Sequence, residues 1–118
     1  MESTPPVDQV EFDALLELLD RDTMREVVQL FMHSAPERLA TARGGLASGD
    51  YTAVATAFHT MRSGCGQLGA RPLEALCADG ERLAKAGDHT AASARLEEAQ
   101  AEFARCARWF LDHGWVDA

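Results

Sequence analysis

Apolar residues recur every three or four positions along most of this chain, a spacing compatible with little other than amphipathic helices. The clearest example lies near the C-terminus, where successive apolar residues stand four or three positions apart: Ala92, Leu96, Ala99, Phe103, Cys106 and Phe110. Helices packed nearly antiparallel in a bundle have this spacing. No stretch alternates apolar and polar residues as a strand does, and β-branched residues are sparse. The sequence therefore predicts an all-α fold.

Glycine, proline and aspartate residues divide the chain into five expected helices. The first three are expected over residues 10–19, 22–47 and 51–66. The fourth has Pro72 in its first turn and ends at Gly87, and Asp88 caps the fifth. The connections between the long segments are short, which favours antiparallel neighbours. We expect an up-and-down four-helix bundle with a short extra N-terminal helix. A length of 118 residues fits a single domain over 1–118, with residues 1–8 as a flexible tail.

Pro36 lies inside the second expected helix. It lacks the N–H that would bond the carbonyl of Met32, so a kink is expected there. Ser34 could instead cap a new helix in the stretch "SAPE". The apolar stripe runs through this point without a break, and for that reason we favour one kinked helix.

Charge and composition exclude several classes of partner and site. The formal net charge of −8 disfavours binding to nucleic acid or to an anionic membrane surface. No apolar run approaches the ~18 residues of a membrane span, and the start "MESTPPVDQV" does not resemble a signal peptide, so a cytoplasmic protein is expected. Cys65, Cys77 and Cys106 are widely spaced and fit reduced core residues. No Cys or His cluster has zinc-ligand spacing, so no metal site is expected.

One histidine of the third expected helix stands apart from the apolar face of that helix. The face consists of residues four or three positions apart: Val54, Phe58, Met61, Cys65 and Leu68. At about 100° per residue, His59 lies roughly 140° from the centre of this stripe and should face water or the rim of the core. Arg62, Ser63 and Gly66 share its side of the helix. Small residues near an imidazole leave room for an incoming group, and the arginine indicates that this group is anionic.

These residues form a pattern that resembles a known family. The stretch "FHTMRSGCGQLGA" is similar to the phosphoacceptor motif of histidine-containing phosphotransfer (HPt) domains in bacterial two-component phosphorelays. His59 matches the acceptor, Met61 the apolar position, Arg62 the usual lysine, and Leu68 to Ala70 the closing Leu-Gly-Ala. Further on, "LEALCADGERL" is similar to the next helix of the family, which places Glu81 where a Gln or Glu commonly orients the imidazole. The strong match covers roughly residues 50–85.

The resemblance implies a phosphorelay intermediate. His59 would accept a phosphoryl group from a receiver-domain aspartate of a hybrid histidine kinase and pass it to the receiver domain of a response regulator. Arg62, Ser63 and Gly66 would neighbour the phosphoryl group, and Glu81 would hold the imidazole. The chain would be a shuttle without kinase activity, because it shows no nucleotide-binding fingerprint or phosphate-binding glycine loop. It would need no cofactor of its own, with Mg²⁺ only on the partner receiver domain, and a monomer is the default expectation.

Three positions depart from the family pattern, and the first, Arg62 in place of lysine, keeps the positive charge. Ser63 stands where the family usually has glycine, and its hydroxymethyl group could narrow access to the imidazole or donate a hydrogen bond to the phosphoryl group. Gly80 replaces the usual leucine before Glu81 and would let the third and fourth helices approach more closely.

Other functions stay open at the level of sequence. An interaction module that binds a receiver domain or kinase without transfer is the main alternative, and Ser63 is its best support. The phosphoacceptor part of a sensor kinase is disfavoured, because the pattern is that of one closed bundle without an ATP-binding domain. A metal or redox enzyme of the bundle type would need inward-facing Glu-x-x-His pairs, which the four histidines do not supply.

Overall fold

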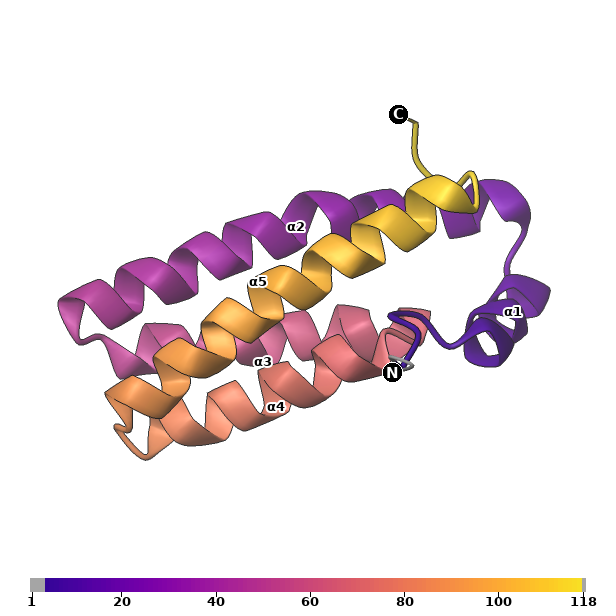
Figure 1. The fold of residues 1–118 in the computed structure, drawn as a ribbon. Helices are drawn as coiled ribbons and strands as arrows, with labels where there is room; N and C mark the ends of the chain where they lie inside the picture. The colour runs from indigo at the N-terminus through magenta and orange to yellow at the C-terminus, as the bar shows by residue number, and fades with distance from the viewer. Residues whose placement is uncertain (1–3, 118) are drawn as a thin grey trace.

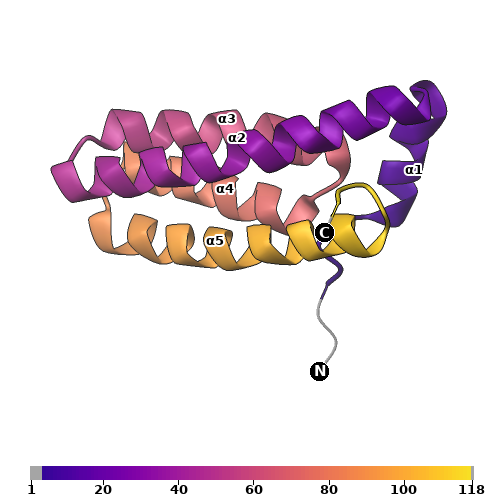
Figure 2. The same ribbon diagram turned by 90° about the horizontal axis from the view of Figure 1, so that it is seen from above.

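Helices make up most of residues 4–117, the part of the chain that the computed structural model describes. They are α1 (Gln9–Leu18), α2 (Arg21–Ser48), α3 (Tyr51–Leu68), α4 (Arg71–Lys85) and α5 (His89–Asp112). The four long helices run side by side, and α1 lies across one end of them (Figures 1 and 2). Residues 4–117 contain no strand. The predicted all-α, up-and-down four-helix bundle with a short extra N-terminal helix is confirmed.

The ends of the helices follow local sequence signals. Asp50 and Asp88, which were expected as caps, accept the backbone N–H of Ala53 and Ala91 through their side chains. Asp8 and Asp20 do the same for α1 and α2. An N-cap carboxylate satisfies an N–H that the helix itself leaves unpaired.

Helix α2 is continuous through Pro36. The alternative of a new helix beginning at Ser34 is therefore wrong. The apolar stripe on both sides of Pro36 is buried, and this common face outweighs the single backbone hydrogen bond that proline cannot donate. A bend at Pro36 stays a prediction.

Helices α3 and α4 approach each other closely at Gly80. A Cβ atom on Gly80 would lie 2.7–2.9 Å from three ring carbons of Phe58, whose side chain is fully buried. The expectation that Gly80 lets these helices come close is confirmed. Cys65, Cys77 and Cys106 are buried free thiols, as predicted for core residues. Because the two helices approach closely here, the next residue, Glu81, lies against α3 and contacts side chains of that helix.

The N-terminal segment differs from the expectation for residues 1–8. Val7 is only 1% exposed, the backbone N–H of Asp8 donates to the carbonyl of Gly69 (2.8 Å), and Arg105 donates to the carbonyl of Thr4 (2.7 Å). The prediction of a flexible tail is therefore wrong for residues 4–8, because Val7 supplies an apolar side chain to the core. Residues 1–3 lie outside the described part of the chain.

Aromatic packing at the end of the bundle fixes α1. The ring of Phe12 lies 5.2 Å from the rings of both Trp109 and Trp115, in edge-to-face arrangements. Arg25 of α2 donates to the carbonyl of Trp115 (3.2 Å). Among the described helices, none is both long and apolar enough to cross a membrane.

Candidate functional site

His59 projects from the middle of α3 toward solvent. Its side chain is 66% exposed, whereas the neighbouring Phe58 is fully buried. The prediction that His59 faces away from the apolar stripe is confirmed. Because α3 turns about 100° per residue, two consecutive residues can belong to the core and to the surface of the same helix.

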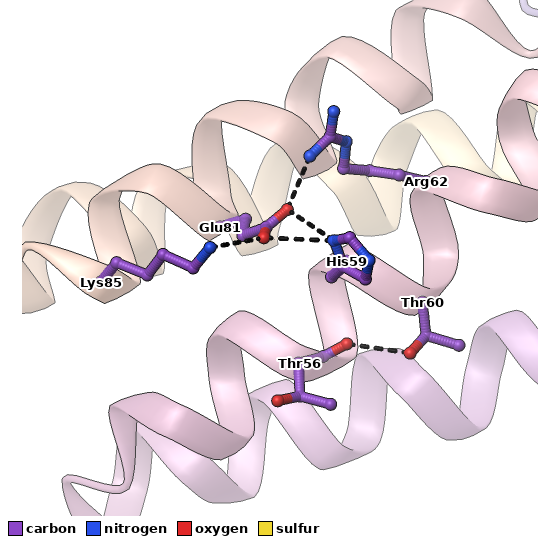
Figure 3. A network of polar contacts seen from close by, with 6 residues as sticks. All are labelled: Thr56, His59, Thr60, Arg62, Glu81 and Lys85. Carbon is purple, nitrogen blue, oxygen red and sulfur yellow. Dashed lines mark hydrogen bonds and ion pairs between the residues drawn. The ribbon is translucent and has the colours of Figure 1, made fainter.

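A buried carboxylate from α4 holds one nitrogen of the His59 ring. Nδ1 lies 3.2 Å from Oε2 and 3.3 Å from Oε1 of Glu81 (Figure 3). Only 6% of Glu81 is exposed. A buried ionised group is costly unless it is paired, so the surroundings of this carboxylate decide what it can do.

Two cations complete the surroundings of the Glu81 carboxylate. Arg62 of α3 donates to Oε1 at 2.7 Å, and Nζ of Lys85 lies 2.9 Å from Oε2 (Figure 3). The structure therefore brings together three of the residues expected from sequence, His59, Arg62 and Glu81, and adds Lys85. Sequence reasoning missed Lys85, although its position four residues after Glu81 on the same helix was a usable signal.

These contacts determine the charge of Glu81. Lys85, Arg62 and His59 lower the pKa of its carboxyl group from an ordinary 4.5 to about 2, and burial opposes them only in part. The carboxylate is therefore ionised at neutral pH and can only accept hydrogen bonds. It follows that the neutral imidazole carries its proton on Nδ1 and donates it to Glu81, which leaves the lone pair on Nε2. An unprotonated imidazole nitrogen is a competent nucleophile.

The His59 site opens into a groove between α3 and α4. The groove has a volume of about 530 Å³, and His59, Glu81 and Lys85 line it together with Tyr51 and Thr56. Of the α3 residues that line the groove, His59 is the last along the chain, so the imidazole lies at one end of it.

Ser63 and Gly66 lie in other surroundings. Ser63 is exposed and lines a second groove of about 330 Å³ between α2 and α3. A Cβ atom on Gly66 would lie 2.7 Å from Oε2 of Glu74, whose Oε1 pairs with Arg71. Packing against α4 therefore explains the glycine at position 66, and clearance for the imidazole is not needed to account for it.

The ionisation of Glu81 predicts a pH dependence of stability. A carboxyl group with a lowered pKa stabilises the folded state above its unfolded pKa, near 4.5, and this contribution is lost as the pH falls through about 2. Arg62 and Lys85 are partly exposed, so solvent screening reduces the contribution to about 2 kcal/mol. Urea unfolding of the wild type and of Glu81→Gln should differ by about this amount at neutral pH. The difference should vanish near pH 2. A difference that is the same at both pH values would contradict this assignment.

Comparisons with known proteins identify a family and a similar fold. The family model of the Hpt domain matches residues 26–109. The crystal structure of histidine-containing phosphotransfer protein B from Pseudomonas aeruginosa PAO1 is similar, with a TM-score of 0.88 and 27% sequence identity, and the alignment covers 94% of this chain and 96% of that one. No curated protein sequence matches the chain at a significant level. Since the family match spans most of the chain, the protein belongs to the Hpt domain family, whose members carry out histidine phosphotransfer in phosphorelays.

Proposed function

We propose that His59 accepts a phosphoryl group on Nε2 from an aspartyl phosphate of a receiver domain and passes it to a second receiver domain. The observation that carries this proposal is an exposed imidazole whose Nδ1 is held by the buried, ionised Glu81. This pairing fixes both the tautomer and the direction of the nucleophile. Family membership supports the general role, and the receiver-domain donor and acceptor are our inference from it.

The transfer is a displacement at phosphorus. The Nε2 lone pair of His59 forms the N–P bond while the bond from phosphorus to the aspartyl oxygen breaks, and the aspartate leaves as a carboxylate. The imidazole keeps its proton on Nδ1, so positive charge develops on the ring. Glu81 lies 3.2 Å from Nδ1 and stabilises that charge. Reversal of the same steps on a second receiver domain completes the relay.

Arg62 is the expected partner of the phosphoryl group. It lies on the same helix face as His59, one turn further on, and its guanidinium group is at the site already. Arginine can bind phosphate oxygens with two N–H groups, whereas lysine acts as a point charge. We propose that this chain supplies no metal ligand and that Mg²⁺ belongs to the partner receiver domain.

Phosphoryl transfer from a panel of phosphorylated receiver domains tests the proposal. We expect the label to move to the full chain and to show the stability of phosphohistidine, which is lost in acid and kept in base. Receiver domains from hybrid kinases and from response regulators should be included, because the relay needs one of each.

The exposed hydroxymethyl group of Ser63, one turn after His59, favours a second candidate, the interaction module without transfer. A chain that binds receiver domains but takes no label from any of them would support that module. A Ser63→Gly variant that then accepted the label would identify Ser63 as the obstacle.

A further inference from the structure

The Glu81 carboxylate is paired with more positive charge than is required to compensate its single negative charge. It carries one negative charge, yet two permanent cations contact it, Arg62 at Oε1 and Lys85 at Oε2, and the Nδ1–H of His59 reaches both oxygens. Figure 3 shows the two cations approaching from opposite sides. One cation would be enough to compensate the charge of a buried carboxylate, so the second needs its own explanation.

The two cations differ in what else they can reach. Arg62 stands three residues after His59 on the same face of α3, and only its NH1 group is engaged with Glu81. Its remaining N–H groups can turn to an anionic group on Nε2. Lys85 stands four residues after Glu81 on α4, where it pairs within its own helix. The ammonium group of Lys85 is therefore tied to Glu81 by local helix geometry, and the guanidinium of Arg62 is not.

An anionic group on His59 would draw Arg62 away from Glu81. Without a second cation, the buried carboxylate would then depend on His59 alone. Loss of the Arg62 contact would raise the pKa of Glu81, and fewer contacts would then hold its carboxylate in place beside Nδ1. That loss would come at the stage when the imidazole carries its positive charge.

We propose that Lys85 is a positioning residue that keeps the Glu81 carboxylate against Nδ1 of His59 when Arg62 turns to the phosphoryl group. It acts through Glu81 and does not contact the reacting atoms. This role rests on the proposed function of His59, but its structural part applies to the unphosphorylated chain as well.

The test uses an Arg62→Met background, which imitates the departure of Arg62 without any phosphorylation. Nitrogen-15 NMR of the His59 ring reports the tautomer, and carbon-13 NMR of the Glu81 carboxyl reports its titration. We expect Arg62→Met alone to keep the proton on Nδ1, because Lys85 still holds Glu81. The double variant Arg62→Met/Lys85→Met should lose the tautomer preference and raise the pKa of Glu81 toward 4.5.

Two further variants separate this role from a general effect of charge. In the Arg62→Met background, Lys85→Arg should keep the tautomer preference that Lys85→Met removes, because arginine also brings a cation to Oε2. Arg82→Met is the matched control on α4, since Arg82 pairs with Asp79 rather than with Glu81. It should leave both NMR readouts at the values of the background.

Transfer kinetics supply the second readout. Lys85→Met alone should lower kcat on the order of tenfold with KM unchanged, since a positioning residue acts on the reaction and not on docking. A raised KM with unchanged kcat would overturn the proposal and make Lys85 a contact of the partner. The proposal would also be overturned if Arg62→Met/Lys85→Met kept the same tautomer preference as Arg62→Met alone. If the wild type takes no label, the proposed function fails, while the NMR comparison still decides what Lys85 does.

Discussion

Replacing His59 by glutamine is expected to abolish phosphoryl acceptance. The amide nitrogen of glutamine has no available lone pair, so nothing at position 59 can attack phosphorus. The amide can still donate to Glu81, and position 59 is exposed, so the variant should fold normally. Radiolabel from a phosphorylated receiver domain should reach the wild type and not the variant. Circular dichroism and the unfolding midpoint should be the same for both.

His33→Gln is the matched control for this experiment. His33 is also an exposed histidine within a long helix, and it pairs with a glutamate four residues on. It lacks a buried carboxylate to hold its ring, so its replacement should leave the labelling unchanged. Label that persists in His59→Gln would exclude His59 as the acceptor, and label that disappears in both variants would show that its loss is not specific to position 59.

Replacing Gly80 by valine is expected to destabilise the bundle by about 2–3 kcal/mol. A Cβ atom at this position would lie 2.7 Å from a ring carbon of Phe58, and because that ring is fully buried it can yield only if its neighbours in the core shift as well. The helix propensity of valine exceeds that of glycine by only a few tenths of a kcal/mol, which does not offset the clash. Thermal unfolding should show a midpoint lower by on the order of 10 °C.

Gly44→Val is the matched control for packing. Gly44 also lies inside a helix, but a Cβ atom there would meet nothing within 4 Å. Its replacement should change the free energy of unfolding by less than about 0.5 kcal/mol. Equal losses at Gly80 and Gly44 would show that the close approach of α3 to α4 is not what the glycine at position 80 serves.

The position of His59 was predictable because it depends on one helix. The apolar residues of α3 define a buried face through their spacing, and the angle between that face and His59 follows from the pitch of the helix alone. The caps at Asp50 and Asp88 were predictable for the same reason, since a cap bonds to an N–H three residues away. Glu81 was placed at the site only by resemblance to a family, and the structure puts its carboxylate beside Nδ1.

The remaining features depend on contacts between segments far apart in the chain. Lys85 is one turn from Glu81 on the same helix. Its role nevertheless depends on the position of α4 along the axis of α3, because that position places Glu81 beside His59. The spacing predicts that Gly66 leaves room for the imidazole, whereas in the structure Gly66 packs against the Glu74 side chain of α4. Val7 carries no periodic signal, because it lies in an irregular segment whose burial comes from packing against the bundle.

By itself, the sequence determined the all-α class, the N-terminal caps Asp50 and Asp88 and the exposure of His59, since each of these follows from interactions within about four residues along one helix. Only the tertiary structure decided which groups surround the imidazole. Gly80 lets α4 settle against Phe58 of α3, and this approach brings Glu81 and Lys85 to His59. The relative height of two packed helices is determined by how their side chains interlock, and no pattern within either helix encodes it.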